Sequence, residues 1–299
     1  MNLKHSPFQL ITKYPWRFAF VGLVLLATLL TIVVVVVGSG LVAPAPSEVG
    51  EPTFPAESIT FASESGSVIH GWFAKGSRAD AAIVLFHPVR ASRLAMVGRA
   101  ELFLKAGYSV LLFDFQAHGE SPGEHITMGY LESRDAKAAV QWLRSTCPGA
   151  RIGGVGFSLG GAAALLGPEP VDVDALVLEC VYPTIEQAVW NRIHQRLGPL
   201  TGLAYPLLIG QLKLRLGIGA ELLHPIDGIR ALKCPVYIIG GELDAHTPPD
   251  ETRALYDAAA TPKELWIVPN AAHADFYEKQ PEEYSRRVLG FFEATLVAR

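Results

Sequence analysis

Short apolar runs alternate with amphipathic stretches along most of the chain, from Ser58 onward. The later runs, such as Ala82–Phe86, are apolar at nearly every position, as in parallel strands that are buried on both faces. A short polar turn separates the first two runs and favours an antiparallel hairpin there. We expect eight strands, at Ser58–Ala62, Val68–Ala74, Ala82–Phe86, Ser109–Asp114, Arg151–Phe157, Ala175–Glu179, Pro235–Gly240 and Glu264–Val268.

Helical patterns occupy the intervals between these strands. Strands and helices that alternate in this way place helices on both faces of a parallel sheet. The pattern therefore predicts an α/β domain over residues 58–299, doubly wound around a mostly parallel eight-stranded sheet. The expected helices are Arg93–Lys105, Leu131–Ser145, Leu159–Leu166, Asp250–Ala259 and Pro281–Leu296.

One interval, residues 183–228, shows no strand pattern. It holds a helical stretch, Ile185–Leu197, and an apolar piece, Leu200–Ile218, in which only Lys213 and Arg215 are charged. A connection of this length in a compact domain usually has structure or function of its own. We expect a helical cap over the carboxyl edge of the sheet. It is either a plain cover for a pocket or a lid that dips into a membrane surface.

The N-terminal region contains an uncharged stretch of 20 residues, Phe18–Val37. As a helix it would span about 30 Å, the thickness of a bilayer core. We interpret it as a transmembrane anchor, followed by a small, Pro-rich and acidic linker at residues 38–57. The alternative is a cleaved signal peptide. The stretch is long for that, and Pro46 follows the only small-residue site, Ala43–Ala45.

Charge on either side of the anchor predicts its orientation. Lys4, Lys13 and Arg17 precede it, whereas the linker is acidic, so residues 1–17 are expected in the cytoplasm and the main domain outside it. The formal net charge is −4, and no basic run suggests nucleic acid. No cofactor or metal is expected, because the sequence has no ligand cluster or dinucleotide fingerprint. The cysteines have no CxxC spacing and are interpreted as buried structural thiols: Cys147, Cys180 and Cys234.

Residues 156–160 read Gly-Phe-Ser-Leu-Gly and fit the pattern G-x-S-x-G. The pattern lies between a strand run and a small, helix-compatible stretch, which is the setting that a nucleophile elbow requires. The glycines allow a strained turn and close packing. Ser158 would then lie at a helix N-terminus, where partial positive charge stabilises an oxyanion.

With this motif in place, the sequence from Ser58 to Ala298 resembles the α/β-hydrolase superfamily. Within it, the sequence is similar to the serine hydrolases called Bem46-like or serine-aminopeptidase-like. The resemblance rests on LFHPVRAS after the third strand run, DFQAHGESPG after the fourth, GGELDAHTPP and AAHADF. One departure is Pro88, because the family usually has glycine after this histidine. The resemblance implies a loop-structuring role for His87, His118 and Asp114.

A serine nucleophile needs a base, and in this fold the order along the chain is serine, acid, histidine. His273 follows the last strand in a loop of small residues and is the candidate base, with His246 as its rival. Asp244 matches the place of the family's acid. Glu179, at the end of its own strand, is the alternative.

Two backbone N–H groups would form the oxyanion hole. One belongs to Leu159, and the other is assigned to Val89, because Pro88 has no N–H. These residues predict a serine hydrolase of the carboxylesterase or lipase type, which acts through an acyl-enzyme on a small-molecule or lipid acyl substrate. Peptidase or acyltransferase activity on the same triad stays open, and so does a non-catalytic, membrane-anchored binding module.

Overall fold

The computed structural model describes residues 15–260 and 262–296. The chain divides into two units, residues 1–41 and 42–299. Helix α2 runs from Pro15 to Val42 and is therefore longer than the predicted span Phe18–Val37. Pro44 disfavours helical backbone at Ala43, which explains why the helix ends there. Lys4 and Lys13, on which the predicted orientation partly rests, lie outside the described residues.

Helix α2 carries large apolar side chains that are exposed along most of its length. In the described part of the chain it is the one helix long and apolar enough to cross a membrane. A signal sequence near the N-terminus would meet the same criterion. The helix is therefore compatible with either interpretation of the N-terminal region.

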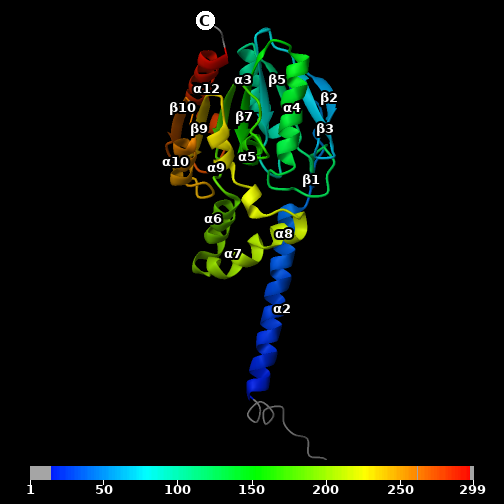
Figure 1. The fold of residues 1–299 in the computed structure, drawn as a ribbon, viewed down its shortest axis with the longest axis vertical. Coiled ribbons are helices and arrows are strands. Elements are labelled where there is room, and N and C mark those ends of the chain that lie inside the picture. Colours follow the sequence, from blue (N-terminus) through cyan, green and yellow to red (C-terminus); the bar gives the residue numbers. More distant parts are fainter. Residues whose placement is uncertain (1–14, 261, 297–299) are drawn as a thin grey trace, which may run out of the picture. The chain divides into compact units, whose positions relative to one another are not determined.

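The second unit is built around an eight-stranded sheet, in the order β10-β9-β8-β7-β4-β5-β3-β2 (Figure 1). Strand β3 is antiparallel to both β2 and β5, and the other neighbours are parallel. This confirms the mostly parallel sheet and its hairpin, and each predicted strand is correct to within one residue at either end. The strands are β2 (Glu57–Ala62), β3 (Val68–Ala74), β4 (Ala81–Phe86), β5 (Ser109–Phe113), β7 (Arg151–Phe157), β8 (Ala175–Glu179), β9 (Val236–Gly241) and β10 (Lys263–Val268).

Two hydrophobic cores lie on opposite faces of this sheet. Ala82, Val84 and Phe86 of β4 pack into one core, and the residues between them pack into the other. Helices cover both faces because each face of a buried parallel strand is apolar. One face carries α4 (Glu132–Thr146), α5 (Leu159–Leu165), α9 (Pro225–Ala231) and α10 (Pro249–Ala258), and the other carries η1 (Arg93–Met96), α3 (Val97–Lys105), α11 (Phe276–Lys279) and α12 (Pro281–Leu296).

The segment predicted as a linker is partly ordered. Strand β1 (Ala45–Pro46) pairs in parallel with β6 (His118–Gly119), and Val49 is buried. The Val42 carbonyl also accepts a hydrogen bond from the Ile126 N–H at 2.9 Å. The second unit therefore begins at residue 42, earlier than the predicted residue 58.

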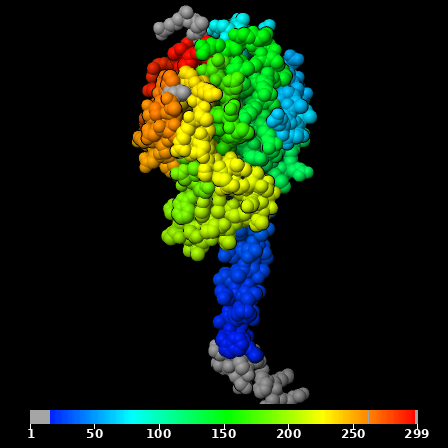
Figure 2. Space-filling view, viewed as in Figure 1, coloured from blue at the N-terminus to red at the C-terminus, as the bar shows by residue number. Residues whose placement is uncertain are grey.

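The interval between β8 and β9 is helical, as predicted for a cap. It contains α6 (Ile185–Leu197), η2 (Gly198–Leu200), α7 (Thr201–Ile209), α8 (Gln211–Leu216) and η3 (Ala220–Leu222). Figure 2 shows these segments in yellow-green as a continuous surface at one end of the second unit. The interval follows the carboxyl end of β8, so the cap starts from the edge of the sheet at which the candidate residues gather.

Candidate active site

Ser158 occupies a strained turn between β7 and α5. Its backbone has φ 52° and ψ −112°, which a residue with a Cβ rarely adopts. The two motif glycines allow the neighbouring elements to approach. A Cβ on Gly156 would lie 2.5 Å from the Cα of Gly161, and one on Gly160 would overlap the carbonyl oxygen of Phe86. The G-x-S-x-G spacing is therefore a steric requirement of this turn.

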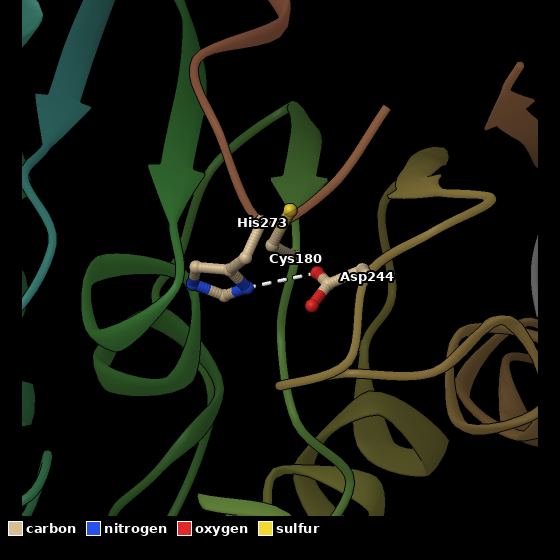
Figure 3. Close-up of side chains that lie close together, drawn as sticks. All are labelled: Cys180, Asp244 and His273. Carbon is tan, nitrogen blue, oxygen red and sulfur yellow. Dashed lines mark hydrogen bonds and ion pairs between the residues drawn. The ribbon is translucent and has the colours of Figure 1, made fainter. Parts of the chain in front are cut away.

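His273 and Asp244 lie in the loops after β10 and β9, and the structure brings them together. The Nδ1 of His273 donates to the Oδ2 of Asp244 at 2.8 Å, as Figure 3 shows. The other oxygen, Oδ1, accepts from the N–H groups of His246 and Thr247 at 2.8 and 2.9 Å. Burial alone would raise the pKa of Asp244, but the His273 bond and the two N–H groups outweigh it and lower that pKa. Asp244 is thus ionised, and Nε2 of His273 is left to accept a proton.

The His273 ring also stacks on Phe157, the residue before Ser158, with ring centroids 5.6 Å apart. This contact brings the imidazole to the serine turn. No hydrogen bond joins the described side chains of Ser158 and His273. Such bonds commonly tighten only when substrate is bound.

The two candidate oxyanion donors belong to elements in close contact. Leu159 begins α5, where backbone N–H groups have no intrahelical acceptor. Val89 lies in the turn after β4, whose last residue, Phe86, meets the start of α5 at Gly160. Among the described residues, the Val89 N–H has no acceptor, which leaves it available as a donor.

His87 supports this turn as a neutral ring. Its Nε2 accepts from the Phe115 N–H at 3.0 Å, so Nδ1 carries the proton and donates to the Pro88 carbonyl at 2.8 Å. Burial lowers the pKa of His87 to about 3, with His118 acting in the same direction. Asp114 accepts from the N–H of Arg93 at 2.7 Å and from its guanidinium at 2.6 Å. These contacts agree with the loop-structuring roles that the resemblance implied.

The rival candidates take other positions. Glu179 is paired with Arg99 rather than with His273. The N–H of His246 donates to Asp244, while its ring lies beside that of His273, with centroids 5.0 Å apart. Burial and the nearby charge of Arg192 lower the pKa of His246. Its ring thus borders the site without a hydrogen bond to the acid.

A buried ion network behind the site was not predicted. Arg99 is 1% exposed and pairs with Glu179 at 2.5 Å and with Asp275 at 2.6 Å. The Tyr284 hydroxyl donates to Glu179 at 2.5 Å. The network links Glu179, at the end of β8, to Asp275. His273 lies two residues before Asp275 in the same loop. The residues that each bond of the network joins are 80 to 185 positions apart in sequence, so no local pattern could reveal them.

Cys180 contacts the candidate acid, which the sequence did not indicate. Burial and the negative charge of Asp244 raise the pKa of its thiol well above the ordinary value, so it stays protonated and donates to Asp244. The ligand atoms of Cys180, Asp244 and His273 lie within 4.8 Å of one another (Figure 3). A metal ion there would have to displace the 2.8 Å hydrogen bond between His273 and Asp244. These residues therefore fit a hydrogen-bonded acid–histidine pair better than a metal site.

The Arg99 network yields a stability prediction. Arg99→Met should lower the free energy of unfolding by about 3–5 kcal/mol, because Glu179 would stay buried without its counter-charge. Urea unfolding of the purified protein measures this. The control is Arg286→Met, which removes an exposed pair with Glu283 and should leave the midpoint unchanged. Equal midpoints for the two variants would contradict the prediction.

Comparisons with known proteins agree with this architecture. The profile of the Alpha/beta hydrolase family matches residues 68–287. Uncharacterized protein YqkD of Bacillus subtilis is 29% identical over 215 residues, covering 71% of this chain and 70% of that protein. Uncharacterized protein Rv2307c of Mycobacterium tuberculosis is 30% identical over 256 residues, covering 82% of this chain and 80% of that protein. The solved Pyrococcus furiosus esterase Pf2001 superposes with a TM-score of 0.70 at 25% identity, covering 86% of this chain and 99% of that one. The chain therefore belongs to the alpha/beta hydrolase family.

Proposed function

We propose that this protein is a serine hydrolase that cleaves carboxylic ester or related acyl bonds with Ser158, His273 and Asp244. The observation that carries the proposal is the 2.8 Å bond from His273 to an ionised Asp244, beside the strained turn of Ser158. Family membership supports hydrolase chemistry, and the resemblance to esterase Pf2001 supports an ester substrate. The Bem46-like subtype belongs to this proposal.

The geometry suggests the following sequence of steps. Ser158 Oγ attacks the acyl carbon while Nε2 of His273 takes its proton, and Asp244 stabilises the imidazolium. The N–H groups of Leu159 and Val89 bind the oxyanion. The bond to the leaving group breaks, and His273 returns the proton to that group. Water then repeats the attack on the acyl-enzyme. Cleavage of an amide, with an amine as the leaving group, or transfer of the acyl group to an alcohol would use the same residues, so peptidase and acyltransferase activities are the alternatives.

Removal of the nucleophile tests the proposal. Ser158→Ala and His273→Ala should each lower kcat for p-nitrophenyl butyrate by about a thousandfold or more, because the triad acts as a unit. Both variants should also lose labelling by a fluorophosphonate probe. The exposed Ser145→Ala is the control and should keep both signals. A Ser158→Ala enzyme with most of its activity would refute the mechanism. A wild-type protein that neither hydrolyses nor labels would favour the binding-module alternative.

Helix α2 is the proposed membrane anchor, with the N-terminus in the cytoplasm and the hydrolase domain outside it. Its exposed apolar surface supports insertion, and the cations Lys4, Lys13 and Arg17 before it, with no further cation until Lys75, support the orientation. An alkaline-phosphatase fusion at Arg299 should be active, and a fluorescent cytoplasmic reporter at the same point should be dark. The opposite pair of results would reverse the orientation. A mature chain that lacks residues 1–42 would show that α2 is a signal sequence.

The cap carries most of the exposed large apolar side chains of the second unit. Trp190, Leu197, Leu200, Leu203, Leu207, Leu214 and Leu222 lie in the cap, against Val68, Leu94 and Leu243 elsewhere among the described residues. Lys213 lies among these leucines. An apolar surface with basic residues can lie in a membrane interface. We therefore propose that the cap admits lipophilic acyl groups from a lipid surface.

Charge placed on this surface tests its role. Leu203→Asp and Leu214→Asp replace side chains that are 71% and 85% exposed, so neither should disturb packing. Each should lower the hydrolysis of long-chain esters presented in anionic vesicles about tenfold, since each removes apolar contact with lipid. Hydrolysis of soluble p-nitrophenyl butyrate should not change. Val68→Asp, at an exposed site far from the cap in sequence, is the control. Equal loss on both substrates would contradict a role in lipid contact.

A further inference from the structure

Cap helix α6 is held on the loop that carries the candidate acid. The Asn191 amide donates to the carbonyl of His246 at 3.2 Å and to Glu251 at 2.7 Å. One turn later, Gln195 donates to the carbonyl of Ala245 at 2.6 Å. Because the loop at residues 244–247 also supplies Asp244, this face of α6 borders the active site.

Arg192 lies on α6 between these two contacts and is half-buried. Its guanidinium donates to the carbonyl of Ala188 at 3.1 Å and forms no ion pair with a described carboxylate. Burial lowers its pKa, although Tyr182 and the carboxylates of Asp244 and Glu251 act in the opposite direction. Asn191 and Gln195 hold this part of α6 on residues 245–246, so Arg192 lies on a helical turn beside the loop of Asp244 and is partly shielded from solvent.

The two fully buried arginines of the described chain are ion-paired, unlike Arg192. Arg93 pairs with Asp114 and Glu120, and Arg99 pairs with Glu179 and Asp275. A guanidinium has five N–H donors, so a single carbonyl acceptor leaves most of those of Arg192 available. A desolvated cation without a counter-ion is costly unless something binds it. Arg192 thus has the properties of a binding group rather than of a structural one.

Glu251, which accepts a hydrogen bond from Asn191 on the same helix, is an alternative partner for Arg192. Its Oε1 accepts from Asn191, and its buried Oε2 has no partner among the described residues. A structural Arg192–Glu251 pair would satisfy Oε2, yet the two side chains form no ion pair. Glu251 therefore binds Asn191, and the guanidinium of Arg192 has no carboxylate partner among the described residues.

We propose that Arg192 is an anion-binding residue of the substrate pocket and that the natural substrates are acyl compounds with a carboxylate or phosphate near the scissile bond. Two parallel N–H donors of a guanidinium bind either group in a bidentate fashion. The residue comes from the cap, so the cap contributes a cation to substrate selection as well as an apolar surface. This inference rests on the proposed hydrolase function and adds the substrate class.

Matched esters test the proposal on the full-length protein. The acyl pair is p-nitrophenyl butyrate and mono-p-nitrophenyl succinate, which carries a carboxylate at the end of an acyl chain of equal length. The leaving-group pair is the butyrate ester of 4-hydroxybenzamide and that of 4-hydroxybenzoate. In at least one pair, Arg192→Gln should lower kcat/KM for the anionic ester about tenfold more than for the neutral one, mainly through KM.

Two further variants separate anion binding from a structural role. Arg196→Gln, one turn along α6, should leave the anionic-to-neutral ratio unchanged. Glu251→Gln should keep or raise that ratio, because it removes a competing negative charge. The proposal is overturned if Arg192→Gln lowers kcat/KM equally for anionic and neutral esters, or if neither pair responds.

A binding measurement keeps the test independent of catalysis. In equilibrium dialysis with radiolabelled succinate, the wild type and Ser158→Ala should bind equally, and Arg192→Gln should bind at least about tenfold more weakly. Absence of ester hydrolysis in the wild type would refute the proposed function, while dialysis would still decide the role of Arg192. Equal binding by the wild type and Arg192→Gln would overturn the anion site.

Discussion

The candidate site depends on the parallel register of β7, β8, β9 and β10. Phe157 pairs with Glu179, Glu179 with Ile239, and Ile239 with Trp266, so the four strands reach their carboxyl edge together. Ser158 follows this line immediately. Asp244 and His273 lie five and seven residues beyond it, in the loops after β9 and β10. The lengths of these loops are what allow a histidine and a carboxylate to reach back to a serine at the edge. A slip of one strand would move one candidate residue out of reach.

Buried charge holds these loops in place. Arg99 joins the end of β8 to the loop of His273, and Arg93 organises the loop after β5 through Asp114. Replacement of such pairs by apolar residues is often neutral in stability, so their value lies in fixing one loop conformation. Around Asp244, the Cys180 thiol and two backbone N–H groups have the same effect. The Asp244 carboxylate is therefore held by His273, by the Cys180 thiol and by two backbone N–H groups.

The sequence was sufficient for the sheet because its strands are apolar on both faces, which separates them clearly from the amphipathic helices. It was sufficient for the strained turn at Ser158, because such a turn has a local glycine signature, and the role of Ser158 as nucleophile stays a prediction. Asp244 and His273 required the family resemblance, since a carboxylate and a histidine in loops carry no local pattern. Arg99 and Cys180 could not be assigned, because their partners are brought together only by the sheet. The order at residues 42–49 was also missed, since a two-residue strand against His118–Gly119 has no apolar period.

The departure at Pro88 illustrates why a family pattern can change without loss of its geometry. His87 must accept from the Phe115 N–H at Nε2, so Nδ1 must donate, and it donates to the carbonyl of residue 88. Every residue type supplies that carbonyl, so proline serves as well as glycine. The low pKa of His87 keeps the ring neutral and the Nε2 acceptor present through the physiological range. Proline removes only the N–H at position 88, which leaves the adjacent Val89 N–H as the candidate donor from this turn. The proposed oxyanion hole thus depends on backbone geometry, which the substitution leaves available.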